Sequence, residues 1–99
     1  MHFIKIHKSY RIVIAVCDSN LIGKKFEEGK RQLDLRENFY KGEEINTEKI
    51  IKLLQHYSIE DATFNIVGKN SIKAAIDAKI ISKTNIDKIN NIPFTLILL

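Results

Sequence analysis

The chain has 99 residues, the length of one domain with a single hydrophobic core, and we expect one domain over residues 1–99. Apolar residues make up 44% of it, and no segment approaches the run of about 20 apolar residues that spans a bilayer. Sixteen lysines and arginines against twelve acidic residues give a net charge of +4. One cysteine cannot form an internal disulfide and no secretory leader opens the chain, so we expect a reducing, cytoplasmic location.

The excess positive charge is unevenly distributed. Residues 1–36 carry a net charge of +4, residues 37–66 of −3 and residues 67–99 of +3. A positive face attracts polyanions, which favours contact with RNA. Thirteen of the sixteen basic residues are lysine, whereas arginine is the better reader of phosphate. Drift of the codons in an AT-rich genome therefore stays open as the alternative explanation.

The first elements are predicted from periodicity. Alternation over Phe3–His7 predicts a strand with Ile4 and Ile6 on one face. A turn over residues 8–10 leads to Arg11, which starts a strand that stays apolar through Cys17, so we expect this strand to be buried on both faces and central in its sheet.

Turn residues organise the next segment. The expected features are a short helical turn over 20–22 capped by Asp18 or Ser19 and ended by Gly23, a turn at Gly29, a strand over Gln32–Arg36, and a loop over Phe39–Gly42 that buries an aromatic residue.

The second half alternates helices and strands. The expected elements are a helix over Thr47–Tyr57 capped by Asn46 or Thr47, a strand over Ala62–Val67, a helix capped by Asn70 or Ser71, and a hairpin over Ile86–Leu99 with its turn at Asn90-Asn91 and Pro93 at the start or edge of the last strand. Strands at both ends with helices between them predict an α+β two-layer sandwich, a mostly antiparallel sheet covered by two helices.

Several short blocks carry a resemblance to a known family. They are Ile4-Lys5-Ile6-His7, Ala15-Val16-Cys17-Asp18, Leu21-Ile22-Gly23-Lys24, Phe26, Glu28-Gly29, Phe39-Tyr40 and Asn65-Ile66-Val67-Gly68. Over nearly its whole length the chain resembles an archaeal family catalogued as domain of unknown function 424. The resemblance implies an archaeal, cytoplasmic, single-domain protein associated with translation and RNA handling, without an established activity.

Cys17 is the one candidate nucleophile, and His7 or His56 could serve it as a base. The alternative is a buried structural thiol, since the neighbouring Asp18 raises a thiol pKa and disfavours the reactive thiolate. The histidine spacings match no zinc motif, and His2 and His7 point to opposite faces of one strand, so we expect no metal and no cofactor.

Gly68-Lys69-Asn70-Ser71 follows a strand and opens a helix, where free backbone N–H groups can hold a phosphate. The turn lacks the upstream glycine of a P-loop, because position 63 is Thr63. Two roles stay open for it: a simple helix cap, or a grip on one RNA phosphate.

Basic residues interleaved with aromatic ones in the first hairpin predict an RNA-binding platform, for which a lysine-protected sheet edge is the alternative. The RNA-binding residues that we predict are Lys5, Lys8, Tyr10, Arg11, Lys24, Lys25, Lys30, Arg31, Lys69 and Lys73. The carboxylate pairs Glu43-Glu44 and Glu60-Asp61 are expected to be solvated.

The sequence thus favours a non-catalytic protein that binds ribosomal RNA or ribosomal proteins, with no membrane and no small-molecule substrate. One alternative is a protein-interaction module that pairs through the apolar tail Phe94–Leu99. Another is a small enzyme centred on Cys17. In that tail, Leu96 and Leu98, or Ile97 and Leu99, are expected to be core residues of one strand.

Overall fold

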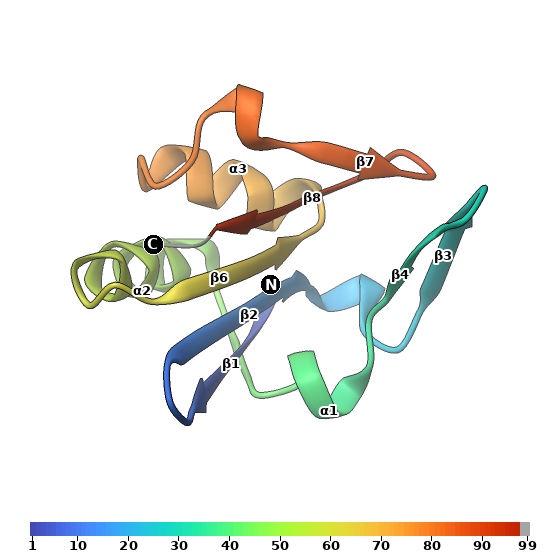
Figure 1. Ribbon diagram of the computed structural model, residues 1–99. Helices are drawn as coiled ribbons and strands as arrows, with labels where there is room; N and C mark the ends of the chain where they lie inside the picture. The colour runs from blue at the N-terminus through green and yellow to red at the C-terminus, as the bar shows by residue number, and fades with distance from the viewer. Residues whose placement is uncertain (98–99) are drawn as a thin grey trace.

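Two β-sheets and three α-helices make up the computed structural model, which describes residues 1–97 (Figure 1). The strands are β1 (His2–Lys8), β2 (Ile12–Asp18), β3 (Lys25–Glu28), β4 (Arg31–Asp34), β5 (Glu43–Ile45), β6 (Thr63–Val67), β7 (Asp87–Ile89) and β8 (Ile92–Ile97). The helices are α1 (Glu37–Tyr40), α2 (Thr47–Ile59) and α3 (Lys69–Asp77), with 3₁₀ turns η1 (Ser19–Leu21) and η2 (Lys83–Asn85).

Six strands form the main sheet, in the order β5-β1-β2-β6-β8-β7. β2 and β6 run parallel, and every other neighbouring pair is antiparallel. The predicted α+β class with a mostly antiparallel sheet is confirmed, as is the central place of the apolar strand β2. In the β1–β2 ladder His2 lies directly opposite Asp18, so both residues stand at the same end of the sheet.

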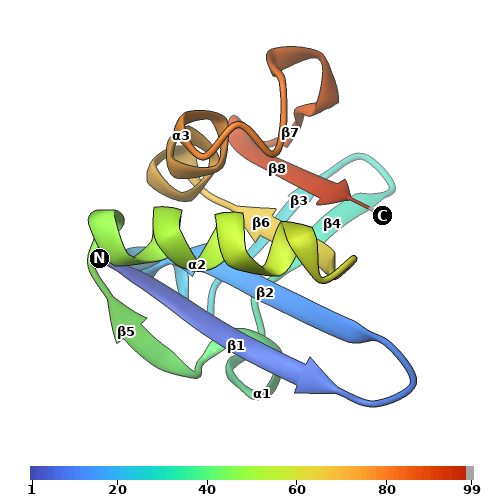
Figure 2. The same cartoon turned by 90° about the vertical axis from the view of Figure 1, so that its left-hand side faces the viewer.

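Helices α2 and α3 lie side by side on one face of this sheet (Figure 2). The predicted first helix is confirmed and is two residues longer than expected. Its predicted cap is also confirmed, because the Asn46 side chain accepts a hydrogen bond of 2.8 Å from the Lys49 backbone N–H.

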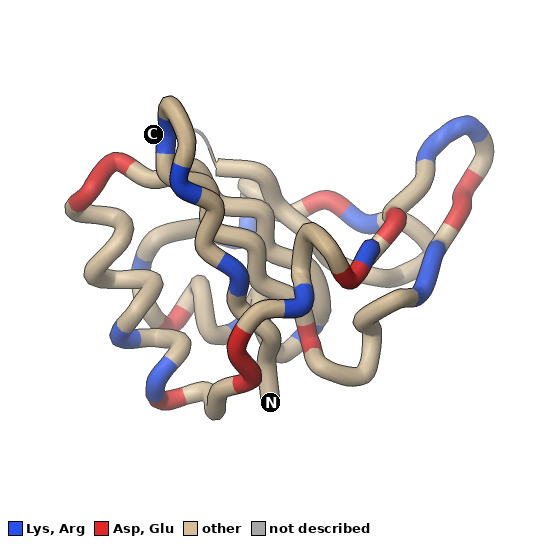
Figure 3. The backbone as a smooth tube through the Cα atoms, turned by 90° about the horizontal axis from the view of Figure 1, so that it is seen from below, with Lys and Arg blue, Asp and Glu red and all other residues tan. Residues whose placement is uncertain are grey.

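The hairpin β3–β4 forms a separate two-stranded sheet beside the main sheet, and basic residues lie near its turn (Figure 3). The sequence predicted an exposed connection here and a single strand over Gln32–Arg36, so β3 was missed and β4 ends two residues earlier. Three of the four residues of β3 are exposed, and a strand without a buried face carries little alternation to detect. Gly29 forms the turn as predicted.

The region after β4 is more regular than expected. The predicted loop over Phe39–Gly42 begins within the short helix α1, although the expected buried aromatic residue is present as Tyr40. β5 was also missed. It has three residues and pairs with the start of β1 at the edge of the sheet.

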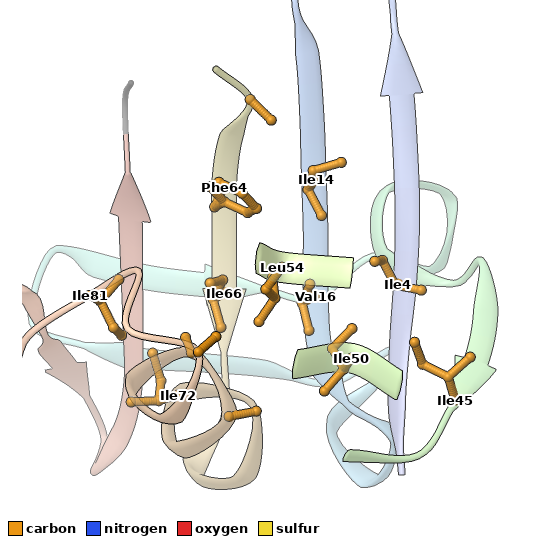
Figure 4. Packing of buried hydrophobic residues seen from close by; sticks show 14 residues of the cluster. Ile4, Ile14, Val16, Ile45, Ile50, Leu54, Phe64, Ile66, Ile72 and Ile81 are labelled. Carbon is orange, nitrogen blue, oxygen red and sulfur yellow. The ribbon is translucent and has the colours of Figure 1, made fainter. Parts of the chain in front are cut away.

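Hydrophobic side chains form a separate core on each face of the main sheet. The larger core lies under α2 and α3, around the fully buried Phe64, Ile14 and Leu54 (Figure 4). The second core contains Cys17 and Leu35 and is covered by η1, α1 and the β3–β4 hairpin. The segment after β2 therefore packs on the sheet and does not hang free as a loop.

The C-terminal hairpin is confirmed. Asn90 and Asn91 both have positive φ, as a two-residue turn requires, and Pro93 lies at the start of β8. Leu96 was expected among the alternating core residues but is 57% exposed, so that half of the expectation is wrong. Ile97 packs against the larger core, while Leu98 and Leu99 lie outside the described residues.

Candidate site at the carboxyl ends of β2 and β6

Two residues end the parallel strands at the same edge of the sheet: Asp18 ends β2, and Gly68 follows β6. The Asp18 carboxylate accepts hydrogen bonds from the backbone N–H groups of Asn70 (3.1 Å) and Ser71 (2.8 Å) at the start of α3. It also accepts one from the Ser71 hydroxyl (2.7 Å). The predicted cap of α3 is thus wrong, because Asp18 from the neighbouring strand caps this helix in place of Asn70 or Ser71. The predicted cap of the turn η1 is also wrong, because in the described part of the chain no side chain bonds to the start of η1.

Gly68 makes this arrangement sterically possible. Its φ is +108°, and a Cβ at this position would stand 2.4 Å from the Asp18 Cγ. Any other residue would therefore displace the carboxylate from the start of α3. Because Asp18 already occupies two of the backbone N–H groups there, the structure does not favour the phosphate grip considered for this turn.

A chain of hydrogen bonds connects Asp18 to the start of α2. The Ser71 hydroxyl donates to Asp18, so its oxygen accepts from His2 Nδ1 (2.8 Å). His2 is then protonated on Nδ1, and its Nε2 accepts from the Thr47 hydroxyl (2.8 Å). Thr47 therefore donates to His2, His2 to Ser71, and Ser71 to Asp18, which is the final acceptor, and these bonds tie β1, β2, α2 and α3 together at one edge.

This network contains Ser, His and Asp but is not arranged as a catalytic triad. In a triad the histidine stands between the carboxylate and the serine and accepts the serine proton. Here Ser71 stands between Asp18 and His2, donates to the carboxylate, and is fully buried, as is His2. Burial lowers the pKa of His2, which keeps the ring neutral beside the hydroxyl groups. The network therefore has a structural role: it holds the start of β1 and the end of β2 against the starts of α2 and α3.

A hollow of about 280 Å³ opens beside the network, and we call it the α3 hollow. Its walls come from β2, η1, α3 and β8, and it is lined by Asp18, Asn20, Leu21, Lys69, Asn70 and Ile92. Asn20 and Asn70 are exposed, and within residues 1–97 their side-chain amide groups make no hydrogen bond. The hollow therefore presents unpaired polar groups next to the two aliphatic side chains.

Four lysines without an ion pair inside the described chain stand at or near this edge. Lys69 lines the α3 hollow, and Lys73 follows one turn later on α3. Lys24 follows the hollow-lining Leu21 and donates its backbone N–H to the Leu21 carbonyl oxygen. Lys30 lies at the β3–β4 turn, where the neighbouring Glu28 accepts a hydrogen bond from the backbone N–H of Asn90. The neighbouring Lys25 and Arg31 are instead paired with Glu27 and Asp87.

Three other predicted RNA-binding residues lie at or near the other end of β2. Lys8 ends β1, and Tyr10 and Arg11 lie in the β1–β2 turn, about 20 Å from Asp18 because β2 has seven residues. The structure therefore does not bring all ten predicted residues onto one platform. Lys5 lies between the two ends, where its ammonium group donates to the Asn38 carbonyl oxygen.

A second hollow, of about 410 Å³, lies at this opposite end and is lined by Tyr10, Arg11, Ile12, Glu60 and Asp61. It is larger than the α3 hollow, but its two carboxylates oppose the approach of a phosphate. Both carboxylate pairs predicted to be solvated are exposed. We therefore place the candidate site at the α3 hollow.

Cys17 is fully buried, as the structural interpretation predicted. Burial and the neighbouring Asp18 raise its pKa to about 12, so the nucleophilic thiolate is disfavoured. His7 lies opposite Val13 and stacks on Phe39, well along the strand from Cys17, whose partner is Phe3. Within the described residues, no three side chains of the metal-binding types come together as a possible metal site.

Three residues of this edge were missed from sequence: His2, Thr47 and Asn20. His2 shares the alternation of Ile4 and Ile6, so a strand begun one residue earlier would have placed it on the buried face. Thr47 and Asn20 carry no comparable signal, because a tertiary contact alone brings them to the site.

Comparison with known proteins places the chain in a family. No curated protein matches the chain. A crystal structure of an uncharacterised conserved protein from Methanopyrus kandleri matches with a TM-score of 0.88 and 22% identity, over 97% of this chain and 89% of that one, which shows a shared fold. No helix within residues 1–97 is long and apolar enough to cross a bilayer. The family model described as "Protein of unknown function (DUF424)" matches residues 7–99, and the chain therefore belongs to that family.

Proposed function

We propose that the protein binds RNA without catalysing a reaction, and that it does so at the edge that carries the α3 hollow. The RNA is ribosomal, or is presented with ribosomal proteins, in an archaeal translation apparatus. One observation carries the proposal: Lys69 and Lys73 have no ion pair within residues 1–97 and stand next to a hollow lined by unpaired amide groups. Lysines that are free of carboxylates can release counterions from phosphates on binding.

The positions of the basic residues restrict the proposed RNA contact to part of the set predicted from sequence. Lys24, Lys30, Lys69 and Lys73 would follow the RNA backbone, because all of them lie at or near this edge. Lys25 and Arg31 form ion pairs with acidic residues of the chain. The β1–β2 turn lines a hollow together with the carboxylates of Glu60 and Asp61. A strand that follows the edge thus meets fewer carboxylates than one that crosses the β1–β2 turn.

Binding of a labelled single-stranded RNA, measured by fluorescence anisotropy over a range of salt concentrations, tests this proposal. The affinity should fall with salt with a slope of about −0.7 for each phosphate contact. Lys69→Glu/Lys73→Glu should weaken binding at least tenfold and make the slope shallower. The matched control is Lys8→Glu/Lys79→Glu, which makes the same charge change at lysines away from the hollow and should have a much smaller effect. Equal losses from both variants would mean diffuse attraction only, and no binding by the wild type would remove the proposal.

A second candidate is pairing with another protein through β8, and one observation favours it. In the described part of β8, β7 pairs with Ile92–Phe94 alone, and Leu96 further along the strand is 57% exposed. Leu96→Asp should abolish a protein contact of this kind while leaving RNA affinity unchanged. Sedimentation of the wild type and the variant through a gradient of cell extract, followed by RNase treatment, separates the two candidates.

A further inference from the structure

We infer that the α3 hollow is a pocket for a single unpaired nucleobase that carries an exocyclic amine, with adenine as the best fit. This inference rests on the proposed function and specifies what the RNA inserts. It follows from the size of the hollow, from the acceptor left on Asp18, and from the two amides beside it.

The size and walls of the hollow suit one base. Pockets for drug-sized ligands have volumes of about 300–1,000 Å³. At about 280 Å³, the α3 hollow takes a single flat group but not a dinucleotide. Leu21 and Ile92 supply aliphatic surface against which the face of a base can pack, as apolar side chains do around extruded bases.

Asp18 selects for a hydrogen-bond donor in the hollow. A carboxylate has about four acceptor positions, and the backbone N–H of Asn70 and the two groups of Ser71 fill three of them. The remaining position belongs to Oδ2, which within residues 1–97 accepts only from the backbone N–H of Asn70. A phosphate in the hollow would be repelled by this charge, whereas an exocyclic amine can donate to it, as cytosine and adenine amines do to carboxylates and amides.

The amides supply the second part of the recognition. Asn20 and Asn70 line the hollow from two different elements, and each carries both a donor and an acceptor. Asparagine pairs with the amine and the ring nitrogen of adenine through two hydrogen bonds at once, so one amide beside Asp18 favours adenine over uracil. Lys69, which also lines the hollow, is then placed to reach a phosphate of the same nucleotide.

Anisotropy titrations with labelled oligo(A) and oligo(U) of six nucleotides test this inference. The wild type should bind oligo(A) about tenfold more tightly, within the range that one good pair of hydrogen bonds gives. Asn70→Ala and Asn20→Ala should lower oligo(A) affinity toward that of oligo(U) and leave oligo(U) unchanged. Asn38→Ala removes an exposed amide on α1 and serves as the control that keeps the preference.

Each outcome separates the inference from the proposed function. Equal affinity for both oligomers in the wild type, with binding still lost in Lys69→Glu/Lys73→Glu, overturns the nucleobase pocket and leaves RNA binding in place. A preference for adenine that survives both asparagine variants places the base elsewhere and also overturns it. No binding of either oligomer removes the proposed function and the pocket together. Because the two amides bond to nothing within residues 1–97, we expect both variants to fold like the wild type, and the thermal midpoint checks this.

Discussion

The Asp18 carboxylate holds the start of α3 by accepting a hydrogen bond of 2.8 Å from the backbone N–H of Ser71, 53 residues away in the chain. This contact brings together the ends of the two parallel strands. It also gives α3 a negative charge at its positive end, where a helix dipole favours one. The hydrogen bonds of Ser71 and His2 extend the contact to α2. The edge with the candidate site is therefore built by tertiary polar contacts as well as by the core.

Gly68→Ala should destabilise the protein by about 3 kcal/mol or more, since both the positive φ and the overlap with Asp18 oppose a side chain. Gly29→Ala is the matched control, because Gly29 also has a positive φ but has nothing within 4 Å of the added carbon. It should cost only about 1 kcal/mol. Urea unfolding measures both changes, and equal losses would show that the contact with Asp18 contributes nothing.

Asp18→Ala should lower the free energy of unfolding by about 2 kcal/mol or more. The substitution leaves the backbone N–H groups of Asn70 and Ser71 without an acceptor and removes the partner of the Ser71 hydroxyl. Asp18→Asn keeps one oxygen acceptor and should cost less. In an Asp18→Ala background the steric part of the Gly68→Ala loss should disappear, so the two losses should not add. Additive losses in the urea measurement would contradict direct contact.

His2 makes stability depend on pH. Burial lowers its folded-state pKa from 6.5, so below about pH 6.5 the unfolded chain binds a proton that the folded chain resists. The contribution is fully present above that pH and is lost as the pH falls toward the folded pKa, at a rate of at most about 1.4 kcal/mol per pH unit. Urea unfolding at pH 7.5 and 5.5 should show this loss in the wild type and a smaller one in His2→Gln.

The control for this measurement is His56→Gln, because His56 is exposed on α2. It should keep the full pH dependence of the wild type. The Arg31–Asp87 pair does not interfere, since the pKa of Asp87 is lowered from 3.8 and its stabilising effect is lost only at lower pH. An equal pH dependence in the wild type and His2→Gln would mean that the network does not depend on a neutral ring.

Cys17 should react slowly with iodoacetamide at pH 8 in the folded protein and rapidly in urea, because its pKa is raised to about 12 and its sulfur is buried. Cys17→Ala should retain RNA binding. Ser9→Cys in that background places a thiol at an exposed position and serves as the reactive reference. Alkylation of native Cys17 at a rate near that of the reference would contradict the structural role and support a nucleophilic one.

The sequence predicts the elements whose patterns are local. β2 is recognisable by its unbroken apolar run, α2 by its apolar stripe and Asn46 cap, and the C-terminal turn by Asn90-Asn91. β3 and β5 escape prediction because they are three or four residues long and mostly exposed, so pairing alone defines them.

The candidate site was only partly predictable. The sequence singles out Lys69 and the turn at Gly68 because a strand meets a helix there. The role of Asp18 could not be inferred, since its neighbours in sequence suggested a local cap and its partner lies on a distant helix. The exposure of Leu96 could not be predicted either, because a buried strand and an exposed interface strand can have the same apolar sequence pattern.

Mapping the contact surface by NMR is the most direct test of RNA binding at the α3 hollow. A ¹⁵N-labelled protein is titrated with the six-nucleotide oligo(A), and the shifts of its backbone amides are followed. The largest shifts should come from residues 20–21, 69–73 and 92, and Lys69→Glu/Lys73→Glu should abolish them. Shifts concentrated at Lys8, Tyr10 and Arg11, or no shifts at all at concentrations where anisotropy reports binding, would contradict the account.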